Sequence, residues 1–334
     1  MSLDHAAKPT STPRTKSRFA FSQHMNELSL FVAIVVLYVV FTSTANGFLS
    51  FNNQINILRD AATIGIAAWA ATLIIIAGEI DVSVGPMVAF ISVVLAFLLQ
   101  WGVPTPVAFA LAIVIGAALG SIAGALRAYF DVPSFVGTLG LWSALRGTAL
   151  FVTDALPVSI GRNDMLDNLD RSFLGVPPAA IIMLVLFGVF TFISRKTAFG
   201  RSVFAIGGNA HAAFLSGIGV AKIRVALFAI AGAMAAISGI LLVSRLGSGN
   251  ATAATGLEFD VIAAVVVGGT SLSGGRGSML GTLLGVLVIT LIGNGLVLLG
   301  INPFFQQVVR GLIIVVAVLA NIQAIKRSVS RNKG

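Results

Sequence analysis

The sequence contains no cysteine and few charged residues. Only 10% of its 334 residues are charged, whereas 57% are hydrophobic, and an ordinary soluble domain has about a quarter charged residues. The lack of cysteine excludes disulfides, iron–sulfur clusters and thiolate metal sites. The three histidines, His5, His24 and His211, lie in polar segments without metal-ligand spacing to acids, so we predict no metal site. Twelve acidic and 21 basic side chains cannot coat a soluble protein of this length.

The hydrophobic residues fall in long blocks, which predict an all-α integral membrane protein. The polar start of the chain is not a secretory signal, because the apolar run from Leu28 lacks a small-residue cleavage site. We therefore predict a cytoplasmic N-terminal tail at 1–27, a transmembrane domain at 28–321 and a cytoplasmic C-terminal tail at 322–334. About ten spans are expected, at 28–45, 60–77, 84–99, 106–126, 134–152, 177–194, 224–243, 259–271, 279–299 and 304–321.

Most basic residues fall in the tails and in the connections on one side of these spans. An excess of Lys and Arg marks cytoplasmic loops, so both termini are predicted to be cytoplasmic. The net charge of +9 is accordingly interpreted as setting the topology, and we expect no nucleic-acid partner.

Two connections are unusually long. The predicted outer connection, 153–176, can form a small surface element, and the predicted inner one, 194–223, holds a helix-compatible stretch at 209–216. Long loops in such proteins usually bind a partner or act as gates. Glycines also recur every four residues within two spans, which favours close helix packing within the chain over a dimer interface. These glycines are Gly116, Gly120, Gly124, Gly281 and Gly285.

The stretch Gly78–Gly85 indicates an interrupted helix, with Glu79 and Asp81 between apolar runs and Pro86 after it. Acids at membrane depth are costly, so they face protein, water or the cytoplasmic interface. A broken helix often marks the solute path or a gate in transporters. Alternatively, Asp81 and Ser83 cap a helix that starts near Val84. The residues alone leave these alternatives open.

A second stretch, Gly268–Gly275, resembles the first. Laid over each other, the two share a first glycine, a last glycine and the serine at Ser83 and Ser273. Each ends a predicted span that runs inward, which suggests an internal duplication of the kind that transporter folds use.

The segment Leu272–Arg276 looks like the signature sequence of ABC-type ATPases. An ATPase also needs a phosphate-binding loop with a Gly-Lys pair, and the chain contains no such pair. We therefore predict no catalytic residue and no ATP hydrolysis by this chain. Two further polar residues fall in predicted spans: Arg146, which we expect to be structural, and Asn294, which either bridges helices or lines a path.

Residues 259–277 resemble the hallmark of bacterial ABC sugar-importer permeases of the ribose, xylose, arabinose and galactose type. Gly78–Gly85 is similar to that family's Gly-Gly-Ile-Asp-Leu-Ser-Val-Gly motif, and residues 207–218 match its cytoplasmic coupling segment. Asn294–Leu296 and 304–311 match as well, and the resemblance covers about 30–321. One departure is Glu79, where the family commonly has glycine.

The resemblance implies a type II-like importer permease in the bacterial inner membrane, working as a homodimer. A cytoplasmic ATPase subunit would use ATP and Mg, a periplasmic sugar-binding protein would deliver a monosaccharide, and the chain itself would bind no cofactor. The outer segments Thr153–Val176 and Ser244–Glu258 would meet the binding protein.

The resemblance also assigns two sets of site residues. The expected ATPase-coupling loop consists of Gly207, Gly208, Asn209, Ala212, Leu215, Ser216 and Gly217. The expected helix-break and translocation motifs consist of Gly78, Glu79, Asp81, Ser83, Gly85, Gly268, Gly269, Thr270, Ser273, Gly274, Gly275 and Asn294. The alternatives are an ion-coupled secondary transporter, which would need intramembrane carboxylates aligned across the bundle, and a membrane scaffold, which would need no paired helix breaks.

Overall fold

The computed structural model describes residues 15–173, 175–302, 304–309, 311–313, 315–316 and 319, with the backbone alone for residues 15–24. The two strands of this part are β1 (Val158–Ser159) and β2 (Ser248–Gly249). The labelled helices are α1 (Thr15–Thr44), α2 (Phe51–Ile76), α3 (Val84–Gln100), α4 (Thr105–Tyr129), α5 (Ser134–Thr153), α6 (Asp164–Asp170), α7 (Pro178–Lys196), α8 (Ala198–Gly208), α9 (Ala210–Leu215), α10 (Val220–Leu246), α11 (Leu257–Val267) and α12 (Met279–Leu298). The described residues 304–309 and 311–313 are helical as well.

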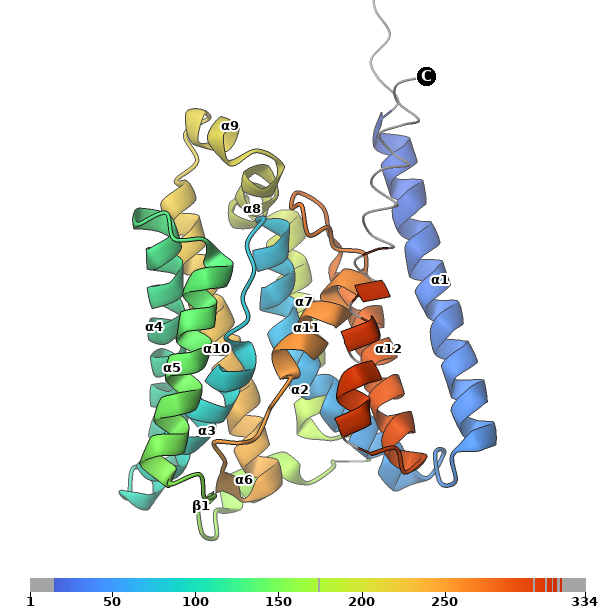
Figure 1. The fold of residues 1–334 in the computed structure, drawn as a ribbon, viewed down its shortest axis with the longest axis vertical. Helices are drawn as coiled ribbons and strands as arrows, with labels where there is room; N and C mark the ends of the chain where they lie inside the picture. Colours follow the sequence, from blue (N-terminus) through green and yellow to red (C-terminus); the bar gives the residue numbers. More distant parts are fainter. Residues whose placement is uncertain are drawn as a thin grey trace, which may run out of the picture.

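The long helices confirm the prediction of an all-α multi-pass membrane protein. Among the described residues, seven helices are long and apolar enough to cross a bilayer: α1 from Met25, α2, α4, α5, α7, α10 and α12. Helices α2 and α10 form the core, because 83% and 61% of the residues in their most apolar 18-residue stretches are buried. In the apolar part of α1, only 11% of the residues of such a stretch are buried. This helix stands at the edge of the bundle beside α12 (Figure 1).

The expected number of ten spans stays a prediction. Helix α3 has 17 residues and α11 has 11, and at 1.5 Å per residue α11 is only about 16 Å long. The full span predicted at 259–271 is therefore wrong, because α11 crosses only part of the bundle. The predicted span at 304–321 includes residues outside the described part, as do most of the predicted tails. Helix α1 already begins at Thr15, inside the predicted N-terminal tail.

Glycines let the helices of one chain approach closely, as predicted. A Cβ added at Gly116 or Gly120 would meet the backbone of Gly232 or Phe228 on α10, and Gly281 faces Gly268 at the end of α11. The interpretation of these stripes as packing within the chain is confirmed.

Helices α3 and α11 both begin part-way through the bundle (Figure 1). After α2, the backbone turns at Gly78, where φ is +80°, and runs extended toward the middle of the bundle, where α3 starts. The connection after β2 approaches the middle from the opposite end, and α11 starts there after Gly256, where φ is +84°. The two N-termini meet, because a Cβ on Gly85 would overlap the Glu258 carboxylate and lie 2.8 Å from the Ala254 carbonyl oxygen.

Small elements close the end of the bundle that lies away from α8 and α9 (Figure 1). Helix α6 and strand β1 lie in the connection predicted to form a small element at 153–176, and β1 pairs antiparallel with β2. The two segments predicted to meet a binding protein therefore lie together. One part of that prediction is wrong: Glu258 is only 2% exposed, because it belongs to the first turn of α11 inside the bundle.

Candidate functional site

Three glycine-containing segments meet at the end of the bundle that carries α8 and α9. The Gly275 N–H donates a hydrogen bond of 2.7 Å to the carbonyl oxygen of Ile76, the last residue of α2. A Cβ on Gly207 would overlap that same oxygen, and one on Gly274 would lie 2.8 Å from the Gly207 oxygen and 3.1 Å from the Gly78 Cα. This glycine junction joins both predicted helix breaks to the predicted coupling segment, which sequence reasoning treated separately.

The predicted coupling segment forms a short helix beyond the junction. The Asn209 side chain caps α9 by accepting a hydrogen bond of 2.9 Å from the Ala212 N–H. Gly217 ends the segment with φ +82°, and Ser216 is exposed.

Helix α9 packs through buried Ala213 and exposes Phe214 and Leu215, whose exposed fractions are 65% and 71%. All seven predicted coupling residues therefore lie at one end of the bundle, from Gly207 and Gly208 at the end of α8 onward.

Sequence reasoning expected only one short helix in this connection and missed α8. Helix α8 contains three glycines, at Gly200, Gly207 and Gly208, which lower its helix propensity. Close packing requires two of them: a Cβ on Gly200 would meet the backbone of Ile193 and Ser194, and Gly207 meets Ile76.

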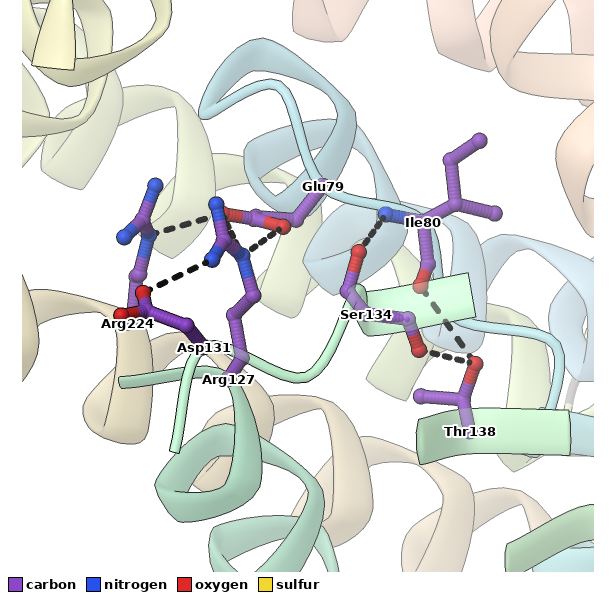
Figure 2. A network of polar contacts seen from close by, with 7 residues as sticks. All are labelled: Glu79, Ile80, Arg127, Asp131, Ser134, Thr138 and Arg224. Atoms are coloured by element: carbon purple, nitrogen blue, oxygen red, sulfur yellow. Dashed lines mark hydrogen bonds and ion pairs between the residues drawn. The ribbon is translucent and has the colours of Figure 1, made fainter. Parts of the chain in front are cut away.

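Glu79 follows Gly78 of the glycine junction and is the buried centre of an ion-pair cluster (Figure 2). The side chain is 4% exposed, and the Arg127 Nε from α4 lies 3.0 and 2.9 Å from its two carboxylate oxygens. The Arg224 Nε from α10 lies 2.7 Å from Oε1, and Arg127 also pairs at 3.6 Å with the exposed Asp131. One carboxylate thus ties the α2–α3 break to two other helices. From the sequence alone, both arginines were interpreted only as charges that set the topology.

The extended backbone after Glu79 takes its hydrogen bonds from α5 (Figure 2). The Ile80 N–H donates to Ser134 Oγ at 3.0 Å, and the Val82 N–H donates to Thr138 Oγ1 at 3.2 Å. Buried backbone groups need such partners where a helix is interrupted. Two hydroxyl-bearing residues one helical turn apart on α5 therefore support the break.

Asp81 and Ser83 form the turn that leads into α3. Asp81 Oδ1 accepts hydrogen bonds from the Ser83 N–H at 2.8 Å and from the Ser83 hydroxyl at 2.6 Å. Ser83 occupies the N-cap position, but its side chain makes no capping hydrogen bond to α3. Asp81 therefore stabilises the turn before α3, and Ser83 does not cap the helix with its side chain. A role of this segment in contacting the solute stays a prediction.

A second buried carboxylate lies where α3 and α11 begin. Glu258 Oε1 accepts a hydrogen bond of 2.9 Å from the Trp142 indole N–H of α5. Oε2 is buried against Gly85 and has no hydrogen-bond partner within the described part of the chain. One turn further along α5, Arg146 donates to the carbonyl oxygens of Ala251 and Ala253. Arg146 is thus held by backbone groups of the β2–α11 connection, as its expected structural role requires.

Sequence reasoning did not single out Glu258 or Trp142. Their only signals were an acid at the edge of an apolar run and a tryptophan four residues before Arg146. Neither signal indicates that the two side chains meet.

The remaining predicted residues lie in a helix bridge, a helix end and turns, and their role in translocation stays a prediction. Asn294 exchanges hydrogen bonds of 3.0 and 2.8 Å with Asn53 of α2, so of its two alternatives the structure supports the helix bridge. Gly268 ends α11, Gly269 follows with φ +89°, and Thr270 is fully buried. Ser273 lies in the turn that precedes α12. Among the described residues, no group of three His, Asp or Glu side chains could hold a metal ion.

Comparison with known proteins decides the family. Residues 53–318 match the model of the branched-chain amino acid transport system permease components. The chain belongs to this family. It is 70% identical to a probable ABC transporter permease, YphD of Escherichia coli K12, over 92% of both chains.

Other relatives carry solute names. The ribose import permease RbsC of Bacillus subtilis is 41% identical over 91% of this chain and 95% of its own, and the xylose transport permease XylH of Escherichia coli K12 is 33% identical over 92% and 94%. The permease therefore lies in the ABC importer group that the sequence motifs indicated. No solved structure matches the chain.

Proposed function

We propose that this permease translocates a monosaccharide that a periplasmic binding protein delivers, driven by ATP hydrolysis on a separate subunit. The glycine junction carries the proposal, because it joins the end of α8, directly before the predicted coupling helix α9, to both helix breaks through backbone contacts. The solute class is supported by the ribose and xylose permeases among the relatives. The chain would lie in the bacterial inner membrane with both termini in the cytoplasm.

Helix α9 is the proposed contact with the ATPase. Its two exposed apolar side chains, Phe214 and Leu215, stand at the end of the bundle, where the predicted topology places the cytoplasm. Exposed apolar side chains of this kind suit a protein partner. A push on α9 would move Gly207 against Ile76 and Gly275, and so shift both breaks. Because backbone lies directly on backbone at the junction, little of this motion would be absorbed by flexible side chains.

The opposite end of the bundle is the proposed contact with the binding protein. There α6 and the β1–β2 pair form a small platform. The first turn of α6 carries Asp164 and Asp167, and Arg162 is exposed beside it. Exposed charges of this kind would orient a partner and speed its association more than they would tighten binding.

An exposed face of α5 supports the proposed homodimer. Only 17% of the residues in the most apolar 18-residue stretch of α5 are buried within one chain. Large apolar side chains lie at both ends of the exposed face, and small and polar residues occupy its middle. Small and polar residues favour helix–helix contact in membranes. In α5 they are Gly140, Ser143, Ala144, Gly147 and Thr148. We propose that a second copy of the chain covers this face and that the solute path lies between the copies.

The proposal is tested with the complete transporter in proteoliposomes. We expect uptake of D-ribose or D-xylose that requires ATP, the ATPase subunit and the loaded binding protein. Accumulation by the permease alone under a proton or sodium gradient would instead favour the ion-coupled alternative.

Leu215→Asp is expected to reduce co-purification of the ATPase at least tenfold, because it places a charge in the proposed apolar contact. Leu215 is 71% exposed, so folding of the permease should be unaffected. Trp101→Gln is the matched control: Trp101 is 75% exposed in the α3–α4 connection at the other end of the bundle. Normal ATPase recovery with Leu215→Asp would remove α9 from the coupling role.

A further inference from the structure

The carboxylate of Glu258 has the features of a ligand site rather than of a structural ion pair. The residue is 2% exposed, and Oε1 accepts a hydrogen bond from the Trp142 indole. Oε2 is buried and has no hydrogen-bond partner among the residues that the structure describes. A buried carboxylate oxygen without a hydrogen-bond partner is destabilising, so its retention calls for an explanation.

Two helix N-termini surround this oxygen. Glu258 lies in the first turn of α11, and Oε2 lies against Gly85 in the first turn of α3. The first N–H groups of a helix have no partner within it, and the helix dipole favours negative charge there. Arg146, on the neighbouring turn of α5, also interacts electrostatically with Glu258. The first N–H groups of α11 are bonded to the carbonyl oxygens of Ala254 and Gly256, and Pro86 has no N–H. The N–H groups of Val84 and Gly85 in α3 are therefore the donors nearest to this oxygen, and Arg146 supplies a positive charge.

The site also lies next to the proposed solute path. Trp142 and Arg146 are half-buried on α5, between its buried residues Leu145 and Ala149 and its exposed residues Ser143 and Gly147. Glu258 therefore lies behind Trp142, on the inner side of α5, and the exposed face of α5 lies on the other side of this tryptophan. The indole adds a flat apolar surface beside a polar handle, which suits the C–H faces and hydroxyls of a sugar.

We propose that Glu258 Oε2, Trp142 and the N-terminus of α3 form a subsite for a neutral, hydroxyl-bearing solute part-way across the bundle. This inference rests on the proposed function. In the present conformation Gly85 closes the subsite, and separation of the α3 and α11 N-termini would open it. A solute hydroxyl then donates to Oε2, while the α3 N–H groups donate to another hydroxyl oxygen.

The first test measures uptake of D-ribose and D-xylose per ATP hydrolysed by the complete transporter in proteoliposomes. Glu258→Gln keeps the size of the side chain and removes its charge, so uptake per ATP should fall about tenfold, as expected for loss of a hydrogen bond to a charged group. Asp260→Asn is the control, since it removes another buried carboxylate from the same turn of α11 and should leave the ratio unchanged.

The subsite would be overturned if uptake per ATP were unchanged in Glu258→Gln, or if Asp260→Asn lost as much. It would also be overturned if a proton gradient drove uptake by the original protein and Glu258→Gln abolished that uptake. Failure of the original transporter to take up either sugar would instead contradict the proposed function.

A second test does not depend on transport by the Glu258 variant. Because the chain has no cysteine, Ser143→Cys introduces a single thiol next to Trp142 on the exposed face of α5. In the permease–ATPase complex in nanodiscs, D-ribose or D-xylose should slow labelling of this thiol by a charged thiosulfonate at least twofold. The protection should disappear when Glu258→Gln is added, and it should be absent for Thr252→Cys, an exposed position in the β2–α11 connection. Labelling of Ser143→Cys that neither sugar slows would contradict the subsite.

Discussion

Gly207→Ala is expected to abolish ATP-driven uptake and to destabilise the permease, whereas Gly208→Ala should do neither. The added methyl at Gly207 would overlap the Ile76 carbonyl oxygen and lie 2.5 Å from the Gly275 nitrogen. Backbone atoms cannot rotate away as a side chain can. The substitution must therefore separate α8 from the end of α2 or break the Gly275–Ile76 hydrogen bond. Overpacking of this kind costs about 1–3 kcal/mol or more.

The neighbouring glycine provides a matched control. Gly208 also lies in α8, and a Cβ there would meet nothing within 4 Å. Alanine favours a helix over glycine by about 1 kcal/mol, so Gly208→Ala should be neutral or slightly stabilising. Thermal unfolding in detergent and sugar uptake in proteoliposomes measure the two effects. Equal behaviour of the two variants would contradict the close contact at the junction and the coupling path through it.

The interruptions of helices could be predicted from the sequence because their signals are local. Glycines, a proline and acids between apolar runs marked Gly78–Gly85, and Asn209 marked the start of α9. Such signals depend on the conformational preferences of residues a few positions apart. The glycine stripes could be interpreted for the same reason, since every fourth residue lies on one helix face.

The contacts between distant segments could not be predicted. Glu79 pairs with Arg127 and Arg224, and Trp142 reaches Glu258 across 116 residues. These pairs depend on which helices are neighbours and how each is rotated, which no local pattern reports. The sequence placed Glu258 in a surface loop because the polar run before α11 looks like a connection. The structure shows instead that this run enters the bundle before the helix begins.

Removal of the Glu79 carboxylate is expected to have the largest effect on stability of any single charge change in the described bundle. Glu79→Ala leaves Arg127 and Arg224, which are 23% and 14% exposed, with the exposed Asp131 as their nearby acid. Breaking a buried ion pair by removing one partner costs about 3–5 kcal/mol. Because the arginines retain some access to water, we expect a loss of about 2–4 kcal/mol in the free energy of unfolding. Asp131→Asn should change it by less than about 1 kcal/mol, since the Asp131 side chain is 95% exposed.

A triple replacement separates the structural role of the cluster from a role in transport. Changing Glu79, Arg127 and Arg224 together to leucine or methionine leaves Asp131, which is 95% exposed, as the one charge of the cluster. Such replacements of buried ion pairs are often neutral or stabilising. Unfolding in mixed detergent and SDS micelles should therefore show that the triple variant is more stable than Glu79→Ala. A triple variant as unstable as Glu79→Ala would mean that the loss is one of packing. Regained stability without regained uptake would show that the charged groups of this cluster, which ties the α2–α3 break to α4 and α10, are needed for transport and not only for stability.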